Sequence, residues 1–348
     1  MTLHQNLYLQ DILSEPESLR TALDRYAAQT LTDAAARLKR GEFSNVVLTG
    51  MGASYCAAYP TWLRLTALPI PVSWVETSEL LHYAPGLVNA RTLLVVISQS
   101  GRSAEILSLI SGEEAVHPAL LVGVTNDLES PLAQQAQVVL PIHAGPERTV
   151  STRTYLNSLA TLLLAACQLL ESPLEPARTA LRAAADSGEA FLAHWEEQVS
   201  VFRHGLGLPQ RMIIAGRGSS LAAVMNGSLI LKEAAKVAYE GMSAPYFRHG
   251  PLELADENLT LWMFAGAAKT RDLNRDLAVE AQRWGARVLW VDDQPDLALQ
   301  TLLIPAVDDL ARPLVEILPL QLYSLAAAEL NGMEAGTFRR IGKVTDRQ

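Results

Sequence analysis

The chain has 348 residues, of which 49% are hydrophobic and 19% charged, so it can build large cores and is not a disordered polymer. Its 28 basic and 37 acidic residues give a net charge of −9 at pH 7, with no run of lysine or arginine. This balance argues against nucleic acid or an anionic membrane as the main partner. An anionic ligand would have to be held by a local binding site, and not by the overall charge of the protein.

Features that mark export or membrane attachment are not seen in the sequence. Cys56 and Cys167 lie far apart and outside any CxxC motif, which favours free thiols in a reducing compartment. The first 20 residues show no basic segment followed by an apolar one, so no export signal is expected. The longest apolar run, residues 159–170, is too short for a bilayer and predicts a buried helix. We therefore expect a cytoplasmic protein with no membrane partner.

The predicted elements repeat along the chain. After a helical segment over residues 1–40, apolar strands are predicted within residues 45–54, 91–98, 121–127 and 138–142, with helical stretches between them. Matching patterns begin 164 to 168 residues later, at residues 211, 259, 288 and 302. Strands that alternate with helices predict a parallel sheet covered by helices on both faces. The repetition predicts two such α/β domains related by duplication.

The repeat also sets the expected domain organisation. We expect an N-terminal helical segment at residues 1–40, a first domain at 41–190, a second domain at 200–330 and a C-terminal tail at 331–348.

A polar loop directly after a buried strand is the first candidate site. Residues 98–103 read Ser-Gln-Ser-Gly-Arg-Ser, and a glycine-rich loop after the preceding predicted strand brings Ser54. Ligands bind beyond the carboxyl ends of parallel strands, and hydroxyls with helix N-terminal N–H groups suit a phosphate. The second domain has Ala-Gly-Ala-Ala at the matching place, residues 265–268, so we assign a phosphate monoester site to the first domain.

These loops also admit other interpretations. Serine and glycine are ordinary residues at turns and helix starts, so the loop alone leaves a structural role open. Residues 50–55, Gly-Met-Gly-Ala-Ser-Tyr, lack the third glycine of a dinucleotide motif, and the chain has no phosphate-loop lysine.

Residues 231–254 form the second candidate site. They predict a helix that carries Lys232, Glu233, Lys236 and Glu240, breaks near residues 241–245 and is followed by His249. These charges could be a solvated helix face and the histidine a turn residue. The alternative is a functional pair, with Glu233 as a general base and His249 as an acid or base beside it, because carboxylate and imidazole groups are readily tuned to move protons near neutral pH.

Several motifs together resemble one family, the sugar isomerase (SIS) domain proteins. The motifs are GMGASYCA at 50–57, SQSGRSAE at 98–105, GPERTVSTRTY at 145–155, ILKEAAKVAYEG at 230–241, FRHGPLEL at 247–254 and RRIGKVT at 339–345. They follow the order found in the isomerase half of glucosamine-6-phosphate synthase and its stand-alone relatives, over about residues 10–346. The resemblance implies two tandem SIS domains, each a flavodoxin-like five-stranded parallel sheet with helices on both faces.

The resemblance also implies site residues. Those that match the phosphate-binding loops are Ser54, Ser98, Gln99, Ser100 and Ser103. Ser151 and Glu147 match residues that contact the sugar or position a loop.

Three further positions match catalytic residues of the family. Glu233 matches the carboxylate that carries a proton between C1 and C2 of the open-chain sugar. His249 matches a histidine that helps to open the sugar ring and comes from the partner subunit of a homodimer, and Lys343 matches a lysine that can form an imine with the sugar carbonyl. No metal and no cofactor are expected.

The departures from the family pattern narrow the expected activity. The lysine that synthases carry three residues before the glutamate is Ile230 here, Ala53 replaces a threonine, and Phe338 replaces a proline in the tail. The synthase's glutaminase domain has no counterpart in the sequence, so ammonia should not be drawn from glutamine. The resemblance therefore favours an amino-sugar-phosphate deaminase or isomerase. The alternatives are a fructosamine-6-phosphate deglycase and a non-catalytic sugar-phosphate sensor, although a sensor would need only the phosphate loops.

Overall fold

The computed structural model describes residues 3–112, 115–340 and 342–343, so residues 344–348 of the expected tail lie outside the described part. The chain divides into two compact units. The first unit comprises residues 17–182 and the residues from 339 onward, and the second comprises residues 1–16 and 183–338. The division falls within helices α2 (Glu15–Arg25) and α9 (Leu174–Leu192). Each unit is thus assembled from segments that are distant in sequence.

The first unit is built on a parallel five-stranded sheet with the order β2-β1-β3-β4-β5. Its strands are β1 (Asn45–Gly50), β2 (Val72–Glu76), β3 (Thr92–Ile97), β4 (Leu120–Thr125) and β5 (Val138–Pro141). Its other helices are α3 (Thr32–Lys39), α4 (Gly52–Leu65), α5 (Thr77–His82), α6 (Ala104–Ser111), α7 (Pro131–Gln135) and α8 (Arg153–Leu169), with a 3₁₀ turn at Pro85–Leu87.

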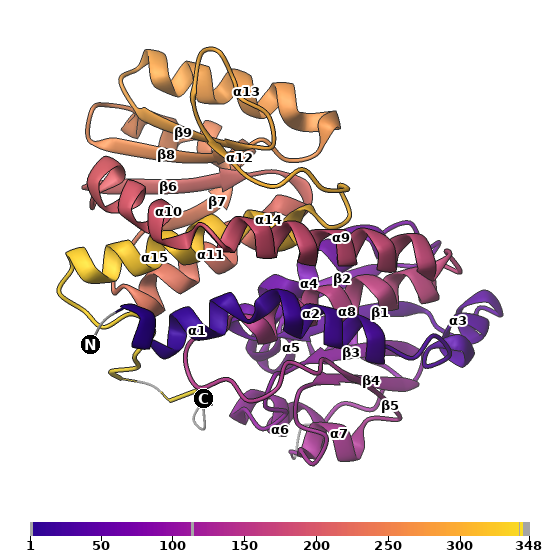
Figure 1. The fold of residues 1–348 in the computed structure, drawn as a ribbon. Coiled ribbons are helices and arrows are strands. Elements are labelled where there is room, and N and C mark those ends of the chain that lie inside the picture. Colours follow the sequence, from indigo (N-terminus) through magenta and orange to yellow (C-terminus); the bar gives the residue numbers. More distant parts are fainter. Residues whose placement is uncertain (1–2, 113–114, 341, 344–348) are drawn as a thin grey trace. The chain divides into compact units, whose positions relative to one another are not determined.

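Alternate side chains of these strands enter two apolar layers, because successive residues of a strand point to opposite faces. Leu94 and Val96 of β3 pack with α5, α6 and α7. Val95 of the same strand faces the other layer, among residues of α4 and α8 and Leu31, which caps α3. Helices therefore cover both faces of the sheet (Figure 1).

The second unit repeats this plan with the order β10-β9-β8-β6-β7. Its strands are β6 (Arg211–Gly216), β7 (Glu240–Ser243), β8 (Leu259–Phe264), β9 (Arg287–Asp292) and β10 (Gln300–Leu303). Its helices are α1 (Leu7–Leu13), α10 (Trp195–Val201), α11 (Leu221–Ala234), α12 (Ala244–Arg248), α13 (Ala268–Arg283), α14 (Arg312–Glu316) and α15 (Leu318–Leu330), with short helical turns at Leu3–Gln5, Phe202–Leu206, Gly218–Ser220 and Pro251–Leu254.

The two sheets have the same topology when the second is read from its other edge, since β7-β6-β8-β9-β10 corresponds to β2-β1-β3-β4-β5. This confirms the predicted α/β class and the two flavodoxin-like five-stranded sheets. All four strand pairs predicted from the repeat are present. The short strands β2 and β7 were not predicted, because neither carries the long apolar run on which the other assignments rest.

The helix predicted to run through Glu240 is shorter than expected. Helix α11 ends at Ala234, and Lys236 has a φ of +59°, a left-handed conformation that stops a helix. Glu240 is instead the first residue of β7. The prediction was wrong at this point because the polar residues after the helix continue its charge pattern while the backbone turns into a strand.

The apolar run at residues 159–170 is a buried helix, as predicted, since almost every residue of α8 is inaccessible to solvent. Its hydrophobicity is explained by burial on all sides. None of the helices in the described ranges is both long and apolar enough to cross a membrane.

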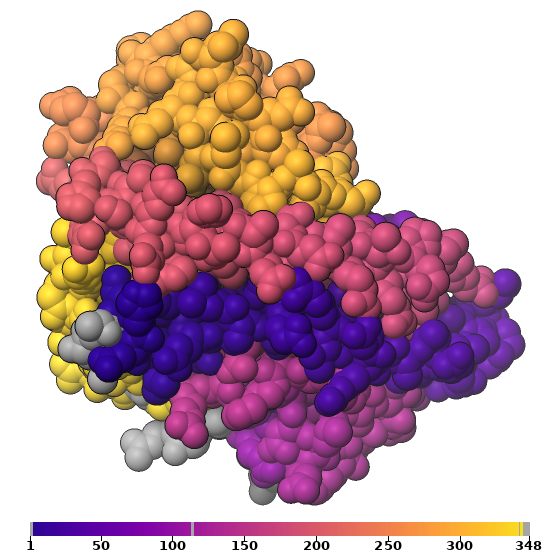
Figure 2. Space-filling model, in the orientation of Figure 1, coloured from indigo at the N-terminus to yellow at the C-terminus, as the bar shows by residue number. Residues whose placement is uncertain are grey.

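The first and last segments of the second unit are joined side by side. Asn6 caps α1 by accepting a hydrogen bond from the N–H of Leu9, and its side-chain amide donates to the carbonyl of Ala335. The hydroxyls of Tyr8 and Ser324 lie 2.9 Å apart. Figure 2 shows the indigo N-terminal residues against the yellow C-terminal segment. These contacts hold the last helix and the first residues of the tail in the second unit.

A buried network of charges fills the carboxyl edge of the second sheet. Arg271 forms an ion pair with Asp292, and Arg312 binds Asp293 with an N–O distance of 3.0 Å. Glu316 is fully buried and accepts a hydrogen bond of 2.9 Å from the hydroxyl of Ser220. Loss of hydration raises the pKa of Glu316 to about 7, although the nearby arginine opposes the shift.

The Glu316→Gln substitution should stabilise the protein at pH 8 and have little effect at pH 5. Because the folded state holds the Glu316 proton more tightly than the unfolded state, the free energy of unfolding falls as pH rises from about 4.5 to about 7. Glutamine keeps the acceptor for Ser220 and removes the ionisation. We expect a gain of about 1–3 kcal/mol at pH 8, measured by urea unfolding at both pH values.

The exposed Glu257→Gln variant is the matched control for removing a carboxyl group from the same unit. An equal gain from Glu316→Gln at pH 5 and pH 8 would contradict the assignment.

Candidate functional site: the carboxyl edge of the first sheet

The strand order of the first sheet creates a crevice between the loops that follow β1 and β3. The chain leaves β1 toward β2 on one side and leaves β3 toward β4 on the other. Loops that diverge in this way open the sheet at the carboxyl ends of the two central strands, where ligands of doubly wound folds bind. The loops at this point are residues 51–54 and 98–103, the two predicted from the sequence.

The loop after β1 brings the backbone close to the crevice. Helix α4 begins at Gly52, which has a φ of +53°, so Ser54 lies in the first turn of the helix. A Cβ atom on Gly50 would lie 2.9 Å from the carbonyl oxygen of Ile97 at the end of β3. Glycine at position 50 therefore allows the close approach of the two strand ends.

The loop after β3 is folded by its own hydroxyls. The Ser98 hydroxyl accepts a hydrogen bond from the N–H of Gly101, and that of Ser100 accepts one from the N–H of Arg102. Gly101 has a φ of +60°, and a Cβ atom there would lie 2.2 Å from the hydroxyl oxygen of Ser130. Position 101 therefore requires glycine, for both conformation and space.

Ser103 has the backbone of a helix cap, but its hydroxyl does not cap the helix. It precedes α6 in an extended conformation, and its side chain accepts no hydrogen bond from the helix N–H groups. Within the described residues, the side chains of Ser54 and Gln99 also have no hydrogen-bond partner. Free hydroxyls and an amide beside the first turns of α4 and α6 offer the donors that a phosphate requires.

Glu147 anchors the loop before α8. Its buried carboxylate accepts hydrogen bonds from the backbone and hydroxyl groups of both Thr152 and Thr154, at 2.6 to 3.1 Å. The same carboxylate pairs with the ammonium of Lys343, which also donates to the carbonyl of Thr149 at 2.7 Å. Burial acts to raise the pKa of Glu147, but Lys343 and Thr154 outweigh it and hold the pKa below its usual range.

Ser151 lies in the same loop and its hydroxyl is 3.1 Å from that of Thr154. The arrangement brings Glu147, Ser151 and Lys343 into one cluster. The two threonines were missed from the sequence, although the Thr-x-Thr spacing after Glu147 is the signal that could have found them.

Glu233 and His249 lie in the second unit, at different ends of β7. Glu233 is in the last turn of α11, which returns to the amino ends of the strands. His249 is an exposed residue that ends α12, beyond the carboxyl end of β7. Because a strand separates the two ends, the imidazole does not lie beside the carboxylate within one chain. Within one chain the two residues therefore lie toward opposite ends of β7, and their joint role in proton transfer stays a prediction.

The backbone around Glu233 is held by the segment that leads to the tail. Lys236 donates to the carbonyls of Glu233 and Thr337, and the N–H of Gly336 donates to the carbonyl of Ala234. The end of α11 and the base of the tail therefore form one hydrogen-bonded structure in the second unit.

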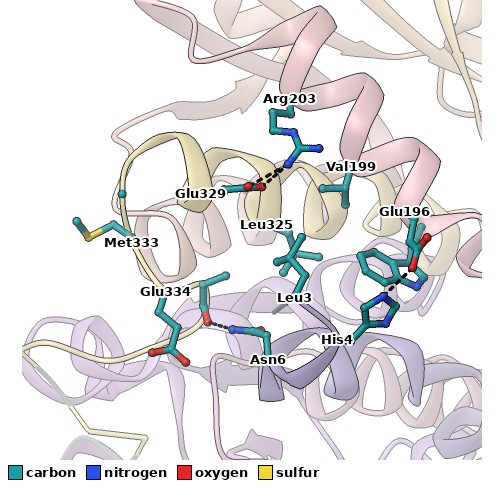
Figure 3. Close-up of a pocket in the computed structure, with 13 residues that line it drawn as sticks. Leu3, His4, Asn6, Glu196, Val199, Arg203, Leu325, Glu329, Met333 and Glu334 are labelled. Atoms are coloured by element: carbon teal, nitrogen blue, oxygen red, sulfur yellow. Dashed lines mark hydrogen bonds and ion pairs between the residues drawn. The ribbon is translucent and has the colours of Figure 1, made fainter. Parts of the chain in front are cut away.

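A cavity of about 700 Å³ opens in the second unit (Figure 3). Its lining includes Glu196 and Glu329, which are paired with His4 and Arg203, and a third carboxylate, Glu334. With no surplus of positive charge, this cavity does not suit a phosphate. Across residues 3–112, 115–340 and 342–343, no group of three or more His, Cys, Asp or Glu side chains is arranged to hold a metal ion.

Comparison with known proteins gives the family. The SIS domain family matches residues 42–167 and 209–328, and the chain belongs to this family. It is 27% identical over 355 residues to the isomerizing glutamine–fructose-6-phosphate aminotransferase of Thermococcus kodakarensis, covering 98% of this chain and 58% of that protein. The chain thus spans less than two thirds of the length of this relative.

Solved structures show the same fold. The C-terminal domain of glucosamine-fructose-6-phosphate aminotransferase from Francisella tularensis aligns with a TM-score of 0.81 at 22% identity, covering 97% of this chain and 99% of that one. A glucosamine-6-phosphate deaminase from Thermotoga maritima aligns with a TM-score of 0.77 at 18% identity, covering 98% and 99%. The two units are accordingly two SIS domains in tandem.

The Ser103→Ala substitution should weaken binding of a sugar phosphate about tenfold to a hundredfold, the range for a hydrogen bond to a charged group. It should leave the melting temperature of the free protein unchanged, because the hydroxyl caps nothing. Affinity for glucosamine 6-phosphate, measured by calorimetry, and thermal melting would be compared for each variant.

Ser130→Ala is the matched control, since the Ser130 hydroxyl does cap α7 by accepting from the N–H of Ala133. It should lower stability by about 1 kcal/mol. Destabilisation by Ser103→Ala with unchanged affinity would show a structural role for that hydroxyl.

Proposed function

We propose that the protein is a phosphosugar enzyme that moves a proton between C1 and C2 of an amino-sugar phosphate and releases the amine. The observation that carries the proposal is the loop at residues 98–103, which lies at the switch point of the first sheet with the hydroxyl of Ser103 unused. The family membership supports a phosphosugar as the ligand. The deaminase from Thermotoga maritima supports the finer choice of substrate.

The phosphate loops would position the substrate. Hydroxyls of Ser54 and Ser103, with the N–H groups at the starts of α4 and α6, would hold the phosphate and fix the carbon chain relative to the protein. The equivalent edge of the second sheet is filled by its own charge pairs, so each copy would bind one sugar phosphate.

Proton transfer would be the work of Glu233. In the open-chain aldose the carboxylate removes the proton on C2 while an acid protonates the carbonyl oxygen, which gives an enolamine. Return of the proton to C1 gives a ketimine at C2. Addition of water to this imine releases ammonia and leaves the ketose phosphate. The sequence consumes one water and requires no oxidant or metal.

His249 would assist ring opening in a neighbouring active site. Its place beyond β7, apart from Glu233 of the same chain, agrees with the homodimer that the family resemblance implies, in which the imidazole serves the partner. His249 is exposed, and imidazole is the side chain best suited to exchange protons near neutral pH.

Lys343 would act first as an anchor. Its ammonium is paired with the buried carboxylate of Glu147 and with a backbone carbonyl, so it holds the tail on the first unit. Formation of an imine with the sugar would require this amine to leave Glu147 and lose a proton. The contacts therefore favour a positioning role for Lys343 in the amine-releasing reaction.

The Glu233→Gln variant should release ammonia from glucosamine 6-phosphate at least about 100-fold more slowly than the wild-type protein, because the amide cannot carry the proton. Its affinity for the sugar phosphate should be unchanged. Ammonia would be followed by a coupled assay with glucosamine 6-phosphate, galactosamine 6-phosphate and a phosphorylated fructosyl-amino acid. Glu240→Gln, an exposed carboxylate at the start of β7, is the control.

The assay separates the proposed activity from its alternatives. Release of a free amino acid without ammonia would move the assignment to a deglycase. Binding of sugar phosphate with no turnover of any substrate would identify a sensor and contradict the catalytic role of Glu233.

A further inference from the structure

Arg102 is the only basic residue in the loop at residues 98–103, and its side chain is tied to the neighbouring loop. Its Nε donates to Oδ2 of Asp127 at 2.9 Å, and its Nη2 donates to the carbonyl of Glu129 at 3.0 Å. Asp127 lies two residues beyond β4, the strand next to β3. The arginine therefore connects the phosphate loop to the loop after the adjacent strand.

Asp127 is itself held in place. Its other carboxylate oxygen accepts a hydrogen bond of 2.9 Å from the N–H of Glu129. This bond and the Arg102 guanidinium hold the pKa of Asp127 below its usual range, so the carboxylate stays ionised at neutral pH. The partner of Arg102 is thus fixed in position and in charge.

Backbone contacts join the same two loops. The carbonyl of Gln99 accepts hydrogen bonds from the N–H of Asn126 at 3.0 Å and from the hydroxyl of Thr125 at 3.2 Å. Through these bonds, the loop after β4 controls where Gln99 and the following hydroxyls lie. The Arg102–Asp127 pair closes the same connection at the far end of the loop.

We propose that the Arg102–Asp127 pair is a positioning clamp that holds the loop at residues 98–103 in its phosphate-binding conformation, without Arg102 contacting the phosphate. The inference rests on the proposed function of this loop. The guanidinium is already engaged by a carboxylate and a carbonyl, and a dianion would have to compete with both. A preorganised loop binds its ligand more tightly because less ordering remains to be done.

The two possible roles of Arg102 predict opposite effects of the Asp127→Asn substitution on the affinity for a sugar phosphate. If the pair is a clamp, Arg102→Gln and Asp127→Asn should each weaken binding of glucosamine 6-phosphate about threefold to tenfold, and the double variant should be no weaker than either single variant. If Arg102 contacts the phosphate, Arg102→Gln should cost far more, whereas Asp127→Asn should tighten binding by removing a nearby negative charge.

The experiment measures affinity for glucosamine 6-phosphate and for inorganic phosphate by calorimetry on the full chain. Arg91→Gln is the matched control, because Arg91 also binds backbone carbonyls of the first unit but precedes β3 at its amino end. In turnover, clamp variants should raise KM with little change in kcat. Hydrogen exchange of residues 98–103 should be faster in both single variants and unchanged in the control.

The outcomes distinguish the clamp from the function on which it rests. Wild-type protein that binds neither ligand would overturn both. Binding by the wild-type protein together with unchanged affinity in Arg102→Gln and Asp127→Asn, or tighter binding in Asp127→Asn, would overturn the clamp and leave the proposed function standing. Melting temperatures of the free variants exclude loss of the fold as the cause of weaker binding.

Discussion

The candidate site depends on the divergence of the chain at the ends of β1 and β3. Neighbouring parallel strands whose connections leave in opposite directions cannot fill the space above their carboxyl ends, so an opening remains there. Gly50 allows the strand ends to approach, Gly101 lets the second loop turn sharply, and helices α4 and α6 begin at the opening. The polar groups of the two loops can act on one ligand only because the strand order places both loops at the same opening.

The same topology occurs twice, but the side chains at the carboxyl edges of the two sheets differ. At the first sheet the loop ends leave polar groups unused, whereas at the second sheet Arg271, Arg312 and their acidic partners occupy the corresponding edge. Charges buried in this way are tolerated only when they are paired. Among the described residues, the first edge therefore presents polar loop groups without partners, whereas the second is occupied by paired charges.

The tail illustrates how a catalytic assignment changes when contacts are known. A lysine near the C-terminus suggests a nucleophile, yet the amine of Lys343 is held by the carboxylate of Glu147, which also organises the start of α8 through Thr152 and Thr154. One buried carboxylate therefore connects a helix terminus to the end of the chain. Its depressed pKa is the consequence of these donors, which keep it ionised despite burial.

By itself, the sequence determined the class of fold and the location of the polar loops that follow β1 and β3. Local hydrophobic patterns predict strands such as residues 92–97, the buried helix α8 and the repeat spacing. These patterns can be read from the sequence without information on contacts between distant residues. The tertiary structure decided what these patterns leave open. The end of α11 at Ala234, the short strands β2 and β7, the separation of Glu233 from His249 and the Arg102–Asp127 and Lys343–Glu147 pairs all depend on strand pairing or on residues far apart in the chain. Local sequence does not encode these features, because the partner that determines each one is supplied only when the chain folds.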